Sequence, residues 1–327
     1  MIKKIAFGFL KLILGFLIGA ILVYLSIKDI RFHDVLDGFK TVNYAYIIPP
    51  LVIFFLMQVL RSWRWGVILS PLAKVDQLSL FSVTSVGFLA IVSIPARIGE
   101  LARPYLITKK SQITMTAAMG TIFVERIFDS LTVLCIFVFA LISMPLPSWL
   151  IRASLVFFLI IILVITGVIL LIVKRDRSIT LLNILFNKLP DKYAVKLNHL
   201  INHFIDGFAV ITDGKRFFTV MLLSVALWLI NGVAIYFIFL AFNFSLPIVV
   251  AFVLMVILMV GIAIPTAPGY VGNWHYFCIL GLTLFGISKS DALAFAIIYH
   301  FLSIGIVILL GLIFLPFNKF SFADLHK

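Results

Sequence analysis

Long apolar runs recur along this 327-residue chain, and they limit its possible folds more than any other feature of the sequence. A helix needs about 20 predominantly apolar residues to cross the hydrocarbon core of a bilayer. Backbone polar groups in lipid must be hydrogen-bonded within the protein, and a helix achieves this within one segment. We therefore predict an all-α fold, a polytopic helical membrane protein in which residues 1–327 form a single integral membrane domain. The predicted apolar segments are residues 5–27, 45–69, 79–94, 117–144, 149–173, 217–242, 248–264, 269–287 and 292–315.

The distribution of basic residues predicts how the chain is oriented. The formal net charge is +13, from 26 Lys and Arg against 13 Asp and Glu. Lys and Arg are enriched in the cytoplasmic loops of membrane proteins, so the excess indicates topology rather than a nucleic-acid partner. The rule places both termini and the basic loop 174–216 in the cytoplasm, and the balanced loop 28–44 outside, in a multi-pass protein of the cell inner (cytoplasmic) membrane. Near the segment ends, we interpret the arginines as markers of the cytoplasmic side and the tryptophans as interface residues: Arg61, Arg64, Trp63, Trp65 and Trp149.

Two short apolar segments, 79–94 and 248–264, end at stretches that contain proline and glycine. A full crossing by the first would leave the two lysines that follow it outside, whereas a re-entrant hairpin over 79–108 returns them to the cytoplasmic side. A second hairpin over 248–287 would enter from the opposite side. The residues that break the two helices are Pro95, Gly99, Pro265, Pro268, Gly269 and Gly272.

The residues around the two breaks also have one sequence separation in common. The same number of residues separates Glu100 from Glu125 and His275 from His300, and each break begins with Ile-Pro. These likenesses favour an inverted repeat. Broken helices that meet near the membrane midplane are typical of transporters built from such repeats.

Charged residues in or beside the apolar segments are the candidates for function. Even mild insertion scales assign each Arg or Asp at a helix centre a cost of about 2.5–3.5 kcal/mol. A structural ion-pair cluster would explain these charges, and so would a polar cavity for a lipid headgroup. We favour the cavity, because small residues can join membrane helices at lower cost. The candidate substrate-binding residues are Arg97, Glu100, Arg103, Glu125, Arg126, Asp129, His275 and His300.

Within this set we expect Glu100 to pair with Arg126. We expect Arg97 and Arg126 to hold a lipid phosphate, because an arginine can donate two parallel hydrogen bonds to it. Each histidine taken alone is more often a hydrogen-bonded core residue than part of a site.

The basic loop 174–216 contains an amphipathic pattern. Leu, Ile and Phe recur at helical spacing over residues 197–208, which predicts a helix on the inner membrane surface or against the bundle. His199 and His203 are four residues apart on it, and a solvated helix face explains them better than a metal site. We expect no metal and no cofactor.

Three stretches together resemble one known family. They are PARIGELARPYLI at 95–107, VERIFD at 124–129 and PTAPGYVGNWH at 265–275. The combination resembles the lysylphosphatidylglycerol synthase transmembrane region, also called the flippase-like family, over most of the chain. Tyr270 stands where the family usually has glycine, and His275 where it often has glutamate. The positions that match the family motifs are Pro95, Arg97, Gly99, Glu100, Arg103, Arg126, Asp129, Pro265, Pro268, Gly269 and Gly272.

The resemblance implies a lipid transporter or flippase that moves a phospholipid or lipid-linked intermediate between leaflets. We do not expect a soluble synthase domain, and we expect a transporter rather than an enzyme. The expected partners are the bilayer and a lipid with a phosphate headgroup, with no nucleic acid. Two alternatives stay open: a membrane-embedded lipid-modifying enzyme that uses the charged cluster, and a scaffold that recruits a lipid synthase through residues 174–216.

Overall fold

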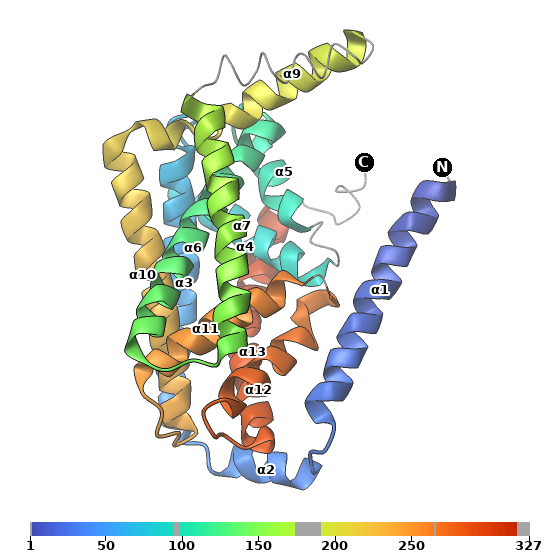
Figure 1. Cartoon of the computed structure of the whole chain (residues 1–327). Helices are drawn as coiled ribbons and strands as arrows, with labels where there is room; N and C mark the ends of the chain where they lie inside the picture. Colours follow the sequence, from blue (N-terminus) through green and yellow to red (C-terminus); the bar gives the residue numbers. More distant parts are fainter. Residues whose placement is uncertain (1, 95–98, 174–190, 265, 319–327) are drawn as a thin grey trace. The chain divides into compact units, whose positions relative to one another are not determined.

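The computed structural model describes residues 2–94, 99–173, 191–264 and 266–318, and every regular element in these ranges is a helix (Figure 1). Five helices among these described residues are long and apolar enough to cross a membrane. They confirm the prediction of an all-α polytopic membrane protein. These helices are α3 (Ile48–Leu69), α6 (Met115–Ser143), α7 (Ser148–Val173), α10 (Gly214–Ala241) and α13 (Lys289–Phe314).

The first apolar segment forms α1 (Ile2–Ile27), and a second helix follows where we expected the loop 28–44. This helix, α2 (Phe32–Lys40), is bent by 76° from α1, and the two pass together as one further candidate span. It packs against α13, where a Cβ at Gly38 would lie 3.3 Å from the Cβ of Ala294. The expectation of a loop was wrong because charged residues alternate with the apolar ones along the sequence of this short helix, although its apolar residues share one face.

The two short apolar segments form helices that end at the predicted breaks. α4 (Gln77–Ser93) has 17 residues and α11 (Ile248–Ala263) has 16, fewer than the about 20 that a full crossing needs. Beyond the breaks the chain continues as α5 (Ala102–Thr108) and α12 (Asn273–Thr283). In both places a short helix ends at the predicted stretch, and another helix begins beyond it.

The chain divides into two compact units that interleave along the sequence. The boundaries fall within α3, α4, α5 and α10, so these helices contribute residues to both units. The first unit consists of Met1–Arg61, Phe81–Arg103 and Leu227–Lys327, and the second of Ser62–Leu80 and Pro104–Ala226.

In the first unit, α11 forms the centre of the core, and Ala251, Val253 and Leu254 are completely buried. α12 contacts α11, α13 and α1. The approach to α1 is so close that a Cβ at Gly272 would clash with the carbonyl oxygen of Gly19. Gly272 has a φ of 97° as well, a backbone conformation that favours glycine. Gly272 therefore serves both the turn of the second break and its contact with α1.

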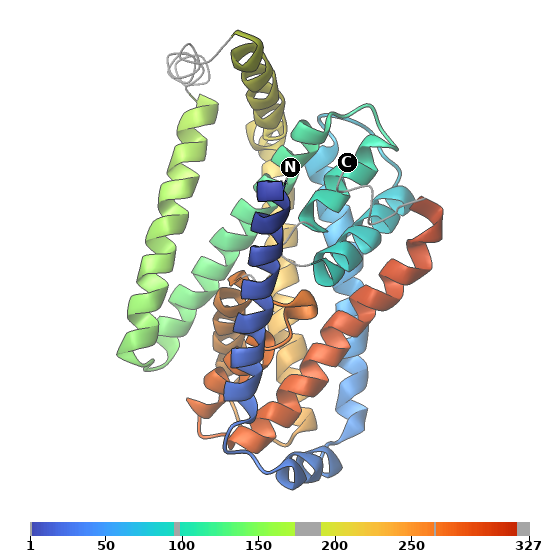
Figure 2. The ribbon, with the colours of Figure 1, turned by 90° about the vertical axis from the view of Figure 1, so that its right-hand side faces the viewer.

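In the second unit, α6 and α7 form a helical hairpin through the short connection 144–147 (Figure 2). The predicted amphipathic helix is confirmed as α9 (Asp191–Asp206), and it packs against α6. A Cβ at Gly120 of α6 would clash with the carbonyl oxygen of Phe204. The rings of Phe204 and Phe123 lie 5.8 Å apart. These contacts hold α9 against α6.

Candidate functional site

Two of the predicted acidic residues lie on one face of α6. Glu125 and Asp129 are one helical turn apart, and their exposed fractions are 1% and 6%. α6 begins at Thr114, whose side chain accepts a hydrogen bond from the backbone N–H of Ala117. A buried carboxylate needs a cationic or hydrogen-bonding partner to offset its lost hydration. These partners come from α3, α10 and α6 itself.

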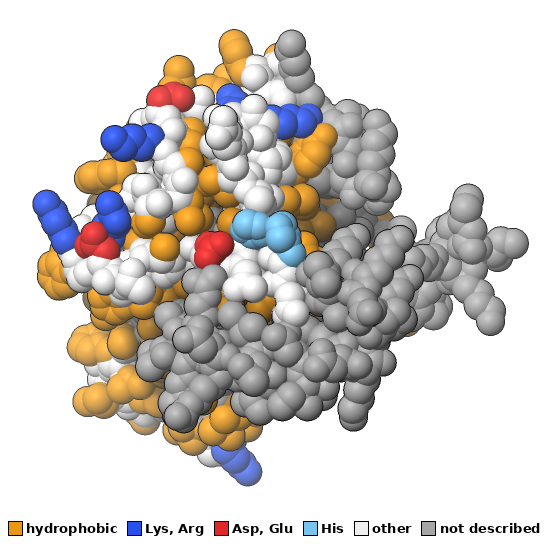
Figure 3. All heavy atoms as spheres, turned by 90° about the horizontal axis from the view of Figure 1, so that it is seen from above, with side chains coloured by type: hydrophobic (Ala, Val, Ile, Leu, Met, Phe, Trp, Pro, Cys, Tyr) orange, Lys and Arg blue, Asp and Glu red, His pale blue; other side chains and the backbone are white. Residues whose placement is uncertain are grey.

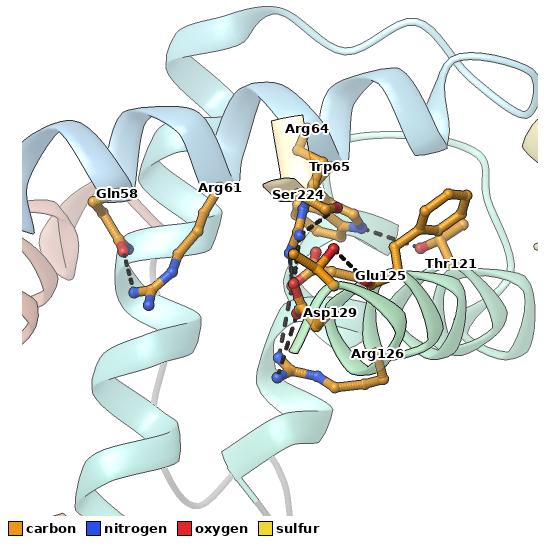
Figure 4. A network of polar contacts seen from close by, with 11 residues as sticks. Gln58, Arg61, Arg64, Trp65, Thr121, Glu125, Arg126, Asp129 and Ser224 are labelled. Carbon is orange, nitrogen blue, oxygen red and sulfur yellow. Dashed lines mark hydrogen bonds and ion pairs between the residues drawn. The ribbon is translucent and has the colours of Figure 1, made fainter. Parts of the chain in front are cut away.

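Arg64 of α3 supplies the closest counter-charge (Figure 4), and it is 2% exposed. Its Nη1 and Nη2 donate to the two carboxylate oxygens of Asp129, the second over 3.2 Å. Nη1 also donates to the Ser224 hydroxyl at 2.8 Å, and Nη2 lies 3.4 Å from Glu125 Oε1. A guanidinium that meets a carboxylate through two parallel hydrogen bonds is held strongly and in a fixed orientation.

Arg126 is the more open guanidinium of this cluster. Its side chain is 43% exposed, and its Nη2 lies 3.6 Å from Glu125 Oε1. Its Nη1 lies 3.9 Å from Asp129 Oδ2. Within the described residues, the Arg64 cluster (Arg64, Glu125, Arg126 and Asp129) therefore joins two guanidiniums to two carboxylates. The predicted pairing of Arg126 with Glu100 joins residues of two different units and stays a prediction.

Trp65 adds a second link between α3 and α6. Its indole N–H donates to the Thr121 hydroxyl at 3.1 Å, and the residue is completely buried. The expectation that Trp65 lies at the membrane interface was wrong, because helix packing covers it. Trp63 and Trp149 are 52% and 44% exposed, as interface residues would be.

The first break is a close turn of the backbone against α4. Pro95 and Arg97 lie outside the described residues. Gly99 is buried, and a Cβ there would clash with the carbonyl oxygen of Ala90. Glu100 follows in the same 3₁₀ turn and is partly buried. The predicted turn residue Gly99 is therefore required by a backbone contact.

Arg103 lies at the start of α5 and is 1% exposed. Its aliphatic stem occupies the space that Gly87 leaves on α4, since a Cβ at Gly87 would clash with Arg103 Cγ. Its guanidinium carbon lies 5.4 Å from the centroid of the Phe88 ring. A predicted site residue is thus buried against a helix that has a glycine at the point of contact.

The second break contains a strained turn. Pro265 lies outside the described residues, and Pro268 begins the 3₁₀ turn Pro268–Tyr270. Gly269 has a φ of 67° and Tyr270 a φ of 58°. Positive φ is uncommon for a residue other than glycine. Tyr270, the departure from the family motif, therefore retains a backbone conformation that suits glycine better.

His275 and His300 meet beside this turn. Their ring centroids lie 4.9 Å apart. His300 Nε2 lies 2.7 Å from the carbonyl oxygen of Gly269, so this nitrogen donates the hydrogen bond. The structure brings the two predicted histidines together, and it groups Glu125, Arg126 and Asp129 separately around Arg64.

On α9, His199 is exposed and His203 is partly buried, and histidine side chains are visible on the face shown in Figure 3. The ring nitrogens of His199 and His203 are 3.1 Å apart, and His203 Nδ1 lies 3.4 Å from Asp206 Oδ2. Within the described part of the chain, no three His, Cys, Asp or Glu side chains are grouped as metal ligands. The solvated helix face remains the simpler interpretation.

Arg64 is the functional candidate that the sequence interpretation missed. Its position near the end of an apolar segment predicts only a marker of the cytoplasmic side. Apolar residues continue after it to Leu69, and α3 continues with them. An arginine followed by another helical turn of apolar residues lies inside its helix, and that signal pointed to a buried partner.

Comparison with known proteins agrees with these motifs. Residues 12–311 match the family model described as lysylphosphatidylglycerol synthase TM region. A UPF0104 membrane protein of Methanocaldococcus jannaschii is 30% identical over 227 residues, which cover 67% of this chain and 90% of the relative. A UPF0104 membrane protein of Methanothermobacter thermautotrophicus is 20% identical over 323 residues, or 94% of this chain and 95% of the relative. No solved structure matches the chain. The chain belongs to the lysylphosphatidylglycerol synthase transmembrane region family.

Proposed function

We propose that the protein moves a lipid with a phosphate headgroup between the leaflets of the cell inner (cytoplasmic) membrane. The observation that carries this proposal is the half-exposed guanidinium of Arg126, beside two buried carboxylates that Arg64 already contacts. Ionisable residues within membrane segments often mark the pathway of a polar substrate. The family description names a synthase of a charged phospholipid, which supports a phospholipid as the substrate.

Arg126 is the residue to which we assign the phosphate. Its side chain retains access to solvent or ligand, whereas Arg64 is shielded and held by Asp129 and Ser224. A phosphate could therefore approach Arg126 without displacing the contacts of Arg64. The other residues in the proposed substrate-binding set are Arg97, Glu100, Arg103, Glu125, Asp129, His275 and His300.

The proposal includes an arrangement in the membrane. The two broken helices are re-entrant hairpins related as an inverted repeat, and both termini are cytoplasmic. Irregular backbone at membrane depth needs protein or water around it, which suits a pathway for a polar headgroup. The protein acts as a transporter and not as an enzyme, and the basic loop 174–216 is the candidate docking segment for a lipid synthase.

Leaflet exchange in proteoliposomes tests this function. The assay follows fluorescent phosphatidylglycerol in phosphatidylcholine vesicles, with a membrane-impermeant quencher outside. We expect exchange above that of protein-free vesicles, loss of most of it in Arg126→Ala, and partial exchange in Arg126→Lys, which keeps the charge without the planar fork. The matched control is Arg152→Ala, which removes an exposed arginine of α7.

Two results would contradict the proposal at different levels. Exchange no faster than in protein-free vesicles would reject lipid transport. Exchange at the wild-type rate in a folded Arg126→Ala protein would reject Arg126 as the phosphate-binding residue.

A further inference from the structure

A second pair of guanidiniums meets at one aromatic ring in the first unit. The guanidinium carbon of Arg61, on α3, lies 4.7 Å from the centroid of the Phe88 ring, and that of Arg103 lies 5.4 Å from the same centroid. Arg103 is 1% exposed and Arg61 is partly buried. The ring attracts each cation, and the two guanidiniums place two positive charges beside one ring.

Buried neutral donors accompany this pair. Arg61 Nη1 donates to Gln58 Oε1 at 3.3 Å (Figure 4), so the amide nitrogen of Gln58 takes no part in this bond. That nitrogen is buried, and no hydrogen-bond partner for it lies among the described residues. The Ser85 hydroxyl, one helical turn before Phe88 on α4, is likewise buried with no partner in the described chain. Folded proteins leave few buried polar groups unsatisfied, so these two donors indicate a polar ligand.

The charge of the surrounding helices favours an anion. The sequences of α3, α4 and α5 contain no Asp or Glu. Glu100 lies in the turn before α5 and supplies one carboxylate near Arg103 in the sequence. Together with this carboxylate, the guanidiniums of Arg61 and Arg103 still sum to a net positive charge. A phosphate offers several acceptor oxygens, which suits two arginines together with neutral donors.

We propose that Arg61 and Arg103 bind the phosphate group of a lipid headgroup beside Phe88. The amide of Gln58 and the hydroxyl of Ser85 are further donors to the same group. This inference rests on the proposed function, because it names a second headgroup site, besides Arg126, within the proposed lipid transporter. A free phosphate ion would offer the same chemistry, and the test separates the two sources.

The test is lipid binding to the full-length protein in detergent, measured by native mass spectrometry. The probes are phosphatidylglycerol, diacylglycerol with the same acyl chains, and inorganic phosphate. Native mass spectrometry counts the bound lipids, and we expect Arg61→Met and Arg103→Met each to weaken the binding of one phosphatidylglycerol molecule by at least about tenfold, with diacylglycerol binding unchanged. The double variant should lose less than the product of the two single effects, because both side chains contact one phosphate. Arg152→Met is the matched control and should bind as the wild type does.

A variant without a charge change keeps the proposal testable if Arg103→Met fails to fold. Gly87→Ala places a Cβ where the stem of Arg103 lies, so it should displace that guanidinium and weaken phosphatidylglycerol binding. Competition by inorganic phosphate would support a site that accepts free phosphate, and absence of competition would support the lipid phosphodiester as the ligand.

The proposal is overturned if the wild type binds diacylglycerol as tightly as phosphatidylglycerol, or if folded Arg61→Met and Gly87→Ala proteins bind phosphatidylglycerol as the wild type does. Its failure is distinguishable from that of the proposed function. Arginine-dependent binding without leaflet exchange would reject transport and keep the site. Exchange that is unaffected by Arg61→Met would keep transport and reject the site.

Discussion

The Arg64 cluster and the Arg61–Arg103 pair show two ways of holding an arginine among apolar helices. Arg64 meets the carboxylates of Glu125 and Asp129. Arg61 and Arg103 share the ring of Phe88, with buried neutral donors nearby. Burial alone therefore does not mark a binding site. The partners of the arginine decide whether its removal costs stability or ligand binding.

The largest expected effect is loss of stability in Arg64→Met. The substitution leaves Asp129 without its bidentate partner, and breaking a buried pair in this way typically costs about 3–5 kcal/mol. Adding Asp129→Asn should recover part of the loss, because the stranded charge is removed. The free energy of unfolding is measured by denaturant titration in detergent. Strict additivity of the two single changes would show that the residues do not stabilise each other.

Two glycine substitutions should have the next largest effects on stability, and they should differ in their effect on lipid binding. A Cβ at Gly120 meets the backbone of Phe204, whereas a Cβ at Gly87 meets the side chain of Arg103. Neither contact can move away freely, because Arg103 Cγ lies near the root of a buried side chain, so we expect each substitution to cost about 1–3 kcal/mol. Gly87→Ala should in addition weaken phosphatidylglycerol binding, which Gly120→Ala should leave unchanged. Weakened binding in a folded Gly120→Ala protein, or unchanged binding in a folded Gly87→Ala protein, would contradict the comparison.

Trp65→Phe should have a smaller effect on stability. It removes the hydrogen bond from the indole to Thr121 and replaces the bicyclic indole with a smaller phenyl ring, which adds a small packing loss to the loss of the bond. One such bond contributes about 0.5–1.5 kcal/mol. Thermal unfolding should report this loss, with lipid binding unchanged because the residue belongs to the structural link between α3 and α6. Loss of phosphatidylglycerol binding in a folded Trp65→Phe protein would argue against that division of roles.

The smallest effect concerns pH and the start of α4. The backbone N–H of Ser79 donates to the Asp76 carboxylate at 2.8 Å, and this hydrogen bond lowers the pKa of Asp76 below its ordinary value. The bond stabilises the ionised form, so its contribution is present above the unfolded-state pKa and is lost as the pH falls through the lowered pKa. Asp76→Ala should therefore lower the melting temperature slightly at pH 7 and less at pH 3. Asp76→Asn, which can still cap the helix, is the control. A difference that grows on acidification would contradict this sign.

Local features of this fold were predictable from the sequence. The length of the apolar segments indicated the spans, and the spacing of Leu, Ile and Phe indicated α9. The Pro and Gly stretches indicated the ends of α4 and α11. Each of these features depends on neighbours within one segment, so periodicity and turn residues were sufficient. α2 was missed because it is short and because charged residues lie between its apolar residues in the sequence, which hides their common helical face.

The partners of the arginines were not predictable in the same way. Asp129 is 65 residues from Arg64, and only packing of α3 against α6 brings them together. The rule that basic residues mark the cytoplasmic side gave Arg61 and Arg64 one interpretation, although the structure places them in different surroundings. The motif residues Glu125 and Asp129 were found by their charge, but their main partner lies outside the motifs.

Lipid-dependent thermal stability tests the distinction between the two arginine groups most directly. The melting temperatures of the wild type, Arg64→Lys and Arg61→Met are measured with and without phosphatidylglycerol, since a ligand that binds the folded state raises the melting temperature. We expect Arg64→Lys to melt at a lower temperature and to keep the rise caused by the lipid. In Arg61→Met the lipid should raise the melting temperature by clearly less than it does in the wild type. A full rise in Arg61→Met, or its loss in Arg64→Lys, would contradict the account.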